Sequence, residues 1–382
     1  MKKKIQFSFK DNIIITVFII FSLAYSITVA TNFTFEPSYV SSNVGYFDKY
    51  KDKLNLTENI RGHREFLGGA AGDAIQYFAV ALGKDDVSHP PYTTRLLLPK
   101  LAGFLAKSSF IFEKTDLINN DILFIRISLL NRFLNILFCF LLVATPFWVF
   151  RKIIFSKSCP ISISILPVMN LVNIGVIMTA PFFMVDISLY VLFTFAAYFF
   201  FRQETYKLFF VVCISLFAKE ISMVLLIPLF YCVTKERKIN FYKKLLIIIL
   251  PLFIYFFSRQ IISGGFLELG QLRYNFLKDP FDFYYLKYHL NLQWGIFNFI
   301  TRVVSSIGII VIISFYMFNR FRVSQDKFLV VLSMLGLVII LNLLLASGVL
   351  RVSQVVTPFF IFYILYSYEN IYKKLTHFRY RD

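Results

Sequence analysis

The chain has 382 residues, of which 58% are hydrophobic and 16% are charged, and it carries a formal net charge of +18. Its apolar residues form long blocks, which excludes an ordinary soluble domain and predicts an all-α, polytopic membrane protein. The basic residues cluster between these blocks, as in cytoplasmic loops, so we expect membrane lipids and no nucleic acid as partners.

The first predicted span covers residues 12–35 and follows a ten-residue segment that contains four lysines. At about 1.5 Å per residue, this run is long enough to cross a hydrocarbon core of about 30 Å. The lysines place the N-terminus in the cytoplasm. A signal peptide cleaved near Ala30 is the alternative, but the run exceeds the usual apolar region of about 7 to 15 residues, so an uncleaved anchor is preferred.

A polar first extracytoplasmic loop is expected at residues 36–120, with helices at about 66–82 and 93–110. The apolar face of the second helix is too short to span a bilayer, so this helix should lie along the outer membrane surface.

The stretch Phe66–Pro99 within this loop is predicted to carry the active site. It combines Asp73 beside a glycine, Tyr77 at helical spacing from Asp73, His89 beside two prolines, and Arg95. A connector with a purely structural role would not need these residues together. His89 in such a place is more often a turn residue than a metal ligand.

The later apolar blocks predict nine further spans, whose ends alternate with basic loops. These blocks are residues 122–150, 158–201 (two spans joined near Pro181), 208–218, 221–234, 242–262, a run ending at 319, 328–350 and 355–371. Residues 208–234 are interpreted as a hairpin that turns at Lys219 and Glu220, because one long span would leave a basic cluster outside. The result is a single integral membrane domain, residues 1–382, with ten spans and both termini in the cytoplasm.

Ionisable residues within or beside these spans fall on the extracytoplasmic side in this topology. They are Arg126, Arg132, Asp186, Lys219, Glu220, Arg259, Arg302 and Arg351. A charge at mid-bilayer costs roughly 2.5 to 3.5 kcal/mol, so such residues usually face a cavity or a partner. Their mainly positive charge suits an anionic ligand such as phosphate. Snorkelling to the interface is the alternative for Arg126, Arg259 and Arg302, and a flanking position is the alternative for Arg351.

Several of these features, in chain order, resemble the C-type (GT-C) integral membrane glycosyltransferases. The resemblance rests on Asp73 in the first loop, the segment PYTTRLLLP at residues 91–99, the FAKE sequence at residues 217–220, and Arg351 with Pro358 before the last span. Each motif is short, so the specificity comes from their co-occurrence along most of the chain.

The resemblance implies an enzyme of the cytoplasmic membrane that takes a sugar from a polyprenyl-phosphate donor. The acceptor would be a glycan, a lipid or a protein on the extracytoplasmic face, and the transfer would invert the sugar. Asp73 would be the catalytic base, and Arg95, Lys219 and Arg351 would hold the donor phosphate. Supporting roles fall to the other polar residues of this side: Glu220, Tyr77, His89, Asp186 and Arg132.

A lone Asp73 stands where many relatives carry paired acids, so the use of a divalent cation stays open, and no other cofactor is implied. Two other functions are compatible with the sequence. An O-antigen-type polysaccharide polymerase would need a larger late extracytoplasmic loop than residues 263–294 provide. A flippase or transporter of lipid-linked saccharides would show ionisable residues on both sides of the midplane and repeated halves.

Overall fold

A computed structural model of the protein describes residues 52–57, 72–84, 95–108, 120–154, 165–170, 186–263, 308, 310–321, 324–345 and 354–378. Within these ranges the regular structure is helical and contains no β-strand. The all-α class expected from the sequence is therefore confirmed for the described part of the chain.

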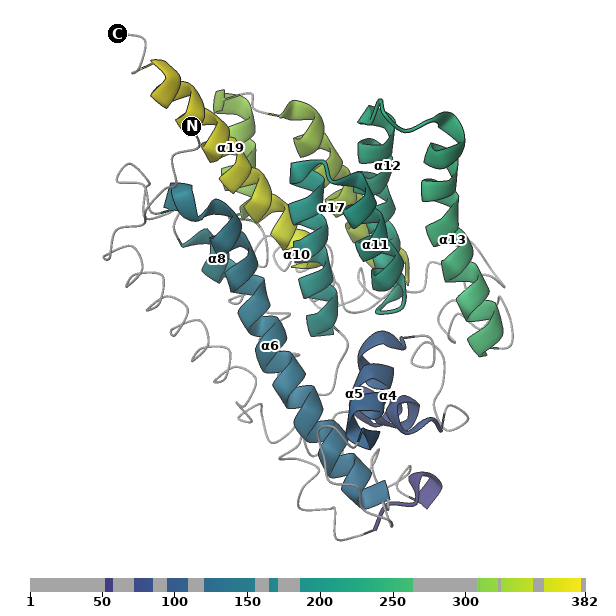
Figure 1. The fold of residues 1–382 in the computed structure, drawn as a ribbon. Coiled ribbons are helices and arrows are strands. Elements are labelled where there is room, and N and C mark those ends of the chain that lie inside the picture. Colours follow the sequence, from purple (N-terminus) through teal and green to yellow (C-terminus); the bar gives the residue numbers. More distant parts are fainter. Residues whose placement is uncertain are drawn as a thin grey trace, which may run out of the picture.

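The helices begin and end close to the predicted apolar blocks, and Figure 1 shows their arrangement. In chain order they are α4 (Gly72–Leu82), α5 (Leu97–Lys107), α6 (Asn120–Ile154), α8 (Leu166–Met169), α10 (Asp186–Arg202), α11 (Thr205–Leu216), the 3-10 helix η3 (Glu220–Leu225), α12 (Leu226–Lys235), α13 (Phe241–Ser263), the helix Ile310–Phe321, α17 (Gln325–Leu345), the 3-10 helix η4 (Gln354–Val356) and α19 (Thr357–Phe378).

One helix in the described ranges is long and apolar enough to cross a membrane, namely the 32-residue segment Asn120–Arg151 of α6. Shorter apolar helices occur at Thr205–Leu216, Ile221–Lys235 and Ile310–Phe321. The predicted span at residues 12–35 lies outside the described residues. One span by length and composition is thus supported, and the arrangement with ten spans stays a prediction.

The bundle, which comprises α10 to α13, the helix Ile310–Phe321, α17, α19 and the C-terminal half of α6, contains the larger of two hydrophobic cores. Every residue from Phe359 to Leu365 of α19 has an exposed fraction of 0%. Seven consecutive residues cover about two helical turns, so α19 is enclosed on all sides. The phenylalanines of α19 contact rings from two other helices, as in the edge-to-face pairs Phe193–Phe359 and Phe150–Phe362.

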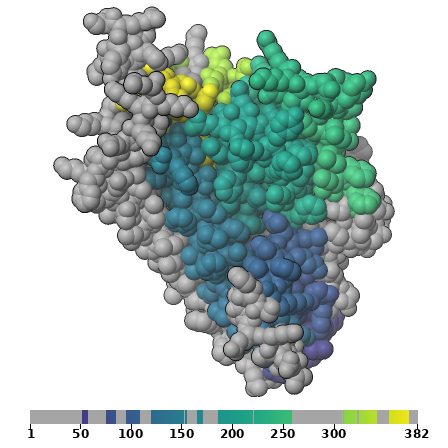
Figure 2. Space-filling view, viewed as in Figure 1, coloured from purple at the N-terminus to yellow at the C-terminus, as the bar shows by residue number. Residues whose placement is uncertain are grey.

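The lobe, which comprises residues 52–57, α4, α5 and the N-terminal half of α6, contains the second core. Figures 1 and 2 show it at one end of the bundle. The rings of Phe78 and Phe124 pack edge to face with centroids 4.6 Å apart. The start of α6 binds residues 52–57, because Asn120 Nδ2 donates to the Leu54 carbonyl at 2.6 Å and Asp121 Oδ1 accepts from the Thr57 amide at 2.9 Å. The 35-residue α6 belongs to both cores and connects them.

The end of the bundle away from the lobe is here called the far end. There Lys327, at the start of α17, contacts two other helices. Lys327 is buried, and its Nζ donates to the Phe201 carbonyl of α10 at 2.9 Å. The same ammonium lies 4.3 Å from the ring centroid of Tyr366 in α19. A cation at a helix C-terminus and against an aromatic face is favourable, so Lys327 connects α10, α17 and α19.

The contact between α4 and α5 generates a prediction about Gly103. A Cβ at this position would overlap the Ala81 carbonyl oxygen and lie 2.8 Å from its carbon. Gly103→Ala should therefore lower the free energy of unfolding by about 1 to 3 kcal/mol, as overpacking does.

Gly336 in α17 supplies the matched control, because a Cβ there would meet no atom within 4 Å. Gly336→Ala should raise the free energy of unfolding by about 0.5 to 1 kcal/mol, since alanine favours the helix. Equilibrium unfolding in detergent measures both changes. Equal changes in the free energy of unfolding for the two variants would contradict the close packing of α4 against α5.

Candidate functional site

Three segments that are far apart in the sequence meet where the lobe touches the bundle: the start of α5, the turn between α11 and η3, and the start of α10 (Figure 1). The contacts that join them are a backbone hydrogen bond from α5 to the turn and an ion pair from the turn to α10. Two residues singled out from the sequence, Lys219 and Asp186, form that ion pair.

The turn forms because α11 ends at Leu216 and the backbone of Lys219 is extended, with φ −164° and ψ 153°. The Ser215 carbonyl accepts three hydrogen bonds in this turn, from the Ala218 amide at 2.9 Å, the Lys219 amide at 3.3 Å and the Ser222 hydroxyl at 2.7 Å. The chain then reverses into η3 and α12. The hairpin expected at Lys219 and Glu220 is confirmed.

Lys219 and Asp186 are bound to each other inside the protein. Lys219 Nζ donates to Asp186 Oδ1 at 2.6 Å, and their side chains are 8% and 6% exposed. Asp186 lies 33 residues before Lys219 in the chain, and the sequence analysis did not pair these two residues. Removal of one member of a buried ion pair is costly because the remaining charge loses its compensation. The pair therefore fixes the turn to the first residue of α10.

The lobe is joined to this turn through the first residue of α5. The Leu97 amide donates to the Phe217 carbonyl at 3.2 Å. The first amides of a helix have no partner within the helix, and the residue before α5, Leu96, provides no side-chain cap. The bundle supplies the acceptor instead, so the start of α5 is positioned by the turn that carries Lys219.

Arg95 lies two residues before α5 and contacts α4. Its Nη1 donates to the Tyr77 hydroxyl at 2.7 Å, and Tyr77 is 2% exposed. Asp73 lies in the first turn of the same helix, four residues before Tyr77. The helical spacing expected for these two residues is confirmed. The lobe thus brings the helix that carries Asp73 into contact with Arg95.

Arg132 belongs to a stripe of buried polar residues on α6, spaced three and four residues apart: Ser128, Asn131, Arg132 and Asn135. This spacing places them on one helix face. The stripe lies where the lobe core, which reaches Leu134, gives way to the bundle core, which begins at Cys139. The polar face of α6 therefore lies next to the part of the helix where the lobe core ends and the bundle core begins.

Other expected site residues are placed in part or not at all. The backbone of Glu220 begins η3, and the backbone of Asp73 lies in α4, while their side chains lie outside the description. His89 and Arg351 lie outside the described residues. Among the described residues there is no cluster of three or more His, Cys, Asp or Glu side chains that could hold a metal ion.

Sequence reasoning missed two buried polar residues near the start of α19. Gln354 in η4 is 0% exposed, and Thr357 at the beginning of α19 is 2% exposed. Both lie between Arg351 and Pro358, where the sequence analysis considered only the two ends. An amide and a hydroxyl side chain within an otherwise apolar run of sequence are the signal that would have indicated them.

The ion pair predicts a strong coupling between Lys219 and Asp186. Asp186→Leu or Lys219→Met alone should lower the free energy of unfolding by about 3 to 5 kcal/mol, because each leaves a buried charge without its partner. The double variant should lose much less than the sum of the two, because it buries no charge. Equilibrium unfolding in detergent measures all four proteins. Additive losses would show that the two side chains do not interact.

The comparisons with known proteins provide no relative from which a function could be transferred. No protein-family model, curated protein or solved structure matches the chain.

Proposed function

We propose that the chain is a multi-pass membrane glycosyltransferase of the C type. It transfers a sugar from a polyprenyl-phosphate donor to a glycan, lipid or protein acceptor on the extracytoplasmic face. The observation that carries this proposal is the junction of lobe and bundle: the amide of Leu97, the first residue of α5 and two residues after Arg95, donates to the Phe217 carbonyl in the turn that contains Lys219. Two cations predicted to bind the donor phosphate thereby belong to segments in direct contact.

Helix lengths support a membrane position with several spans. The helices α13, α17 and α19 have 23, 21 and 22 residues. At about 1.5 Å per residue each is about 30 Å long, which matches the hydrocarbon core of a bilayer. With α6 and the shorter apolar helices they form a single bundle of membrane-spanning size.

The outer surface of the bundle is apolar, as expected of a surface that faces lipid. Large apolar side chains are exposed on several helices, including Trp148 of α6 (71%), Phe210 of α11 (63%) and Phe253 of α13 (58%). Exposed apolar surface of this extent marks contact with a membrane or a partner. In the lobe, Phe104 of α5 is 72% exposed beside Lys107, so α5 suits the outer membrane surface on which the sequence places it.

The charge distribution supports an outward-facing site. The short connections after α10, after α12 and after the helix Ile310–Phe321 are basic together with the helix ends beside them, and they contain Arg202, Lys207, Lys235, Arg237, Lys238, Lys243, Lys244, Arg320 and Lys327. Positive charge in short loops marks the cytoplasmic side. The opposite end, with Asp186 and Lys219, then faces outward together with the lobe.

The proposed reaction assigns a role to each part of this junction. Asp73 accepts the proton of an acceptor hydroxyl while the hydroxyl oxygen attacks the anomeric carbon of the donor sugar. The bond from that carbon to the phosphate oxygen breaks, and Arg95 and Lys219 stabilise the negative charge that develops on the lipid phosphate. Tyr77 and Asp186 hold these two cations in place before the donor binds.

The test is the loss of sugar transfer in Asp73→Asn. A general base contributes about 10²- to 10⁴-fold to a rate, so transfer should fall at least about 100-fold. Membranes that contain the variant are incubated with radiolabelled nucleotide sugars, which load the endogenous polyprenyl phosphate, and the label in the glycan fraction is counted.

The matched control is Asp52→Asn, because Asp52 is an exposed acid of the same lobe. This variant should transfer sugar at the rate of the unchanged protein. Immunoblots of the membrane fraction show that all three proteins are inserted in equal amounts. Full transfer by Asp73→Asn, or an equal loss in Asp52→Asn, would contradict Asp73 as the base.

A further inference from the structure

The helix Ile310–Phe321 has an inner face that packs and an outer face that is exposed. Ile310, Ser314 and Met317 are buried, and Phe318 stacks on Phe328 of α17 with ring centroids 4.6 Å apart. The outer face consists of Ile312, Phe315, Tyr316, Asn319 and Arg320, all of which are exposed. These residues are spaced three and four positions apart, so they form one continuous stripe.

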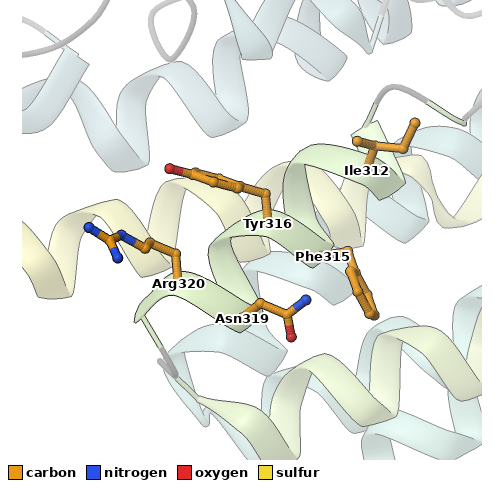
Figure 3. Close-up of a pocket in the computed structure, with 5 residues that line it drawn as sticks. All are labelled: Ile312, Phe315, Tyr316, Asn319 and Arg320. Carbon is orange, nitrogen blue, oxygen red and sulfur yellow. The ribbon is translucent and has the colours of Figure 1, made fainter.

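The five outer-face residues line a shallow hollow, which Figure 3 shows in close-up. Ile312 and Phe315 form its apolar end. The Tyr316 hydroxyl and the Arg320 guanidinium project to the same side, one helical turn apart, whereas the Asn319 amide points toward the side of Phe315 (Figure 3). The hollow therefore changes along the helix from apolar to polar and positively charged.

The polar end of the hollow belongs to the far end of the bundle and carries charge that is not neutralised locally. Asp326, at the start of α17, is bound to Lys235 at 2.9 Å. Within the ranges that the structure describes, Arg320 forms no ion pair. An anionic group can thus approach the guanidinium without displacing an acid of the protein.

We propose that this hollow binds an anionic phospholipid of the cytoplasmic leaflet. Its acyl chain lies against Ile312 and Phe315, and its phosphate accepts hydrogen bonds from Arg320 and Tyr316. The shape selects this ligand class. An open hollow buries too little of the surface of a free small molecule to bind it tightly. A lipid is already concentrated and oriented by the bilayer, so contact with one helix face that carries a cation is sufficient for binding.

The inference rests on the membrane placement described under Proposed function but concerns a different site. Arg320 lies near the end of the helix Ile310–Phe321, whose Phe318 stacks on Phe328 next to Lys327 at the far end. Lys219 and Asp186 instead join the start of α10 to the turn that binds α5 of the lobe. Its readout is bound lipid and not sugar transfer. If Asp73→Asn retained transfer, the proposed activity would be contradicted. The lipid measurement would still show whether this hollow binds an anionic phospholipid.

The experiment titrates phosphatidylglycerol or phosphatidylcholine into the purified full-length protein in a mild detergent and counts bound lipids by native mass spectrometry. The unchanged protein should retain phosphatidylglycerol at least threefold more than phosphatidylcholine. Arg320→Gln should reduce bound phosphatidylglycerol at least fivefold and leave phosphatidylcholine unchanged. The matched control is Arg237→Gln, because Arg237 is an exposed arginine of the far end outside the hollow, and it should retain the preference.

Three results would overturn the proposal: equal retention of both lipids by the unchanged protein, no effect of Arg320→Gln, or the same loss in Arg237→Gln. The first of these needs no variant, so the proposal can be refuted even if Arg320→Gln fails to fold.

Discussion

The buried ion pair between Lys219 and Asp186 is the constraint on which the rest of the structure depends. Two charges removed from water are tolerated only when each compensates the other at close range, and here the donor and acceptor atoms are 2.6 Å apart. The pair fixes the turn after α11 to the start of α10. The same turn accepts the hydrogen bond from Leu97 that positions α5. The ion pair and this hydrogen bond together join the start of α10, the turn after α11 and the start of α5.

The two hydrophobic cores explain why polar side chains can be buried at this level. α6 contributes to both cores, and its polar stripe around Arg132 occupies the boundary between them. A boundary between two packed units can accommodate charges that either core would exclude. Stability and the proposed catalysis then make opposite demands on the same residues, because a cation held by an acid must also bind a phosphate.

The positions of the helices could be predicted from the sequence because uncharged runs and their basic flanks are local signals. The hairpin at Lys219 was found in this way. The partner of Lys219 could not be found, because the contact with Asp186 depends on how α10 and α11 pack. The hydroxyl of Tyr77 accepts a hydrogen bond from Arg95, which helical spacing alone did not indicate. The last predicted span, residues 355–371, falls largely within α19, which continues to Phe378 through polar turns.

In the proposed topology the lobe end of the bundle, which contains the ion pair, faces outward. Thiol accessibility tests it most directly. Asp52→Cys in the lobe and Lys238→Cys at the far end, both exposed positions, are introduced into a protein whose native cysteines are replaced by serine. Spheroplasts are then treated with a membrane-impermeant maleimide. Asp52→Cys should be labelled in intact spheroplasts, and Lys238→Cys only after the membrane is permeabilised. The reverse pattern would place the proposed active site in the cytoplasm and contradict this topology.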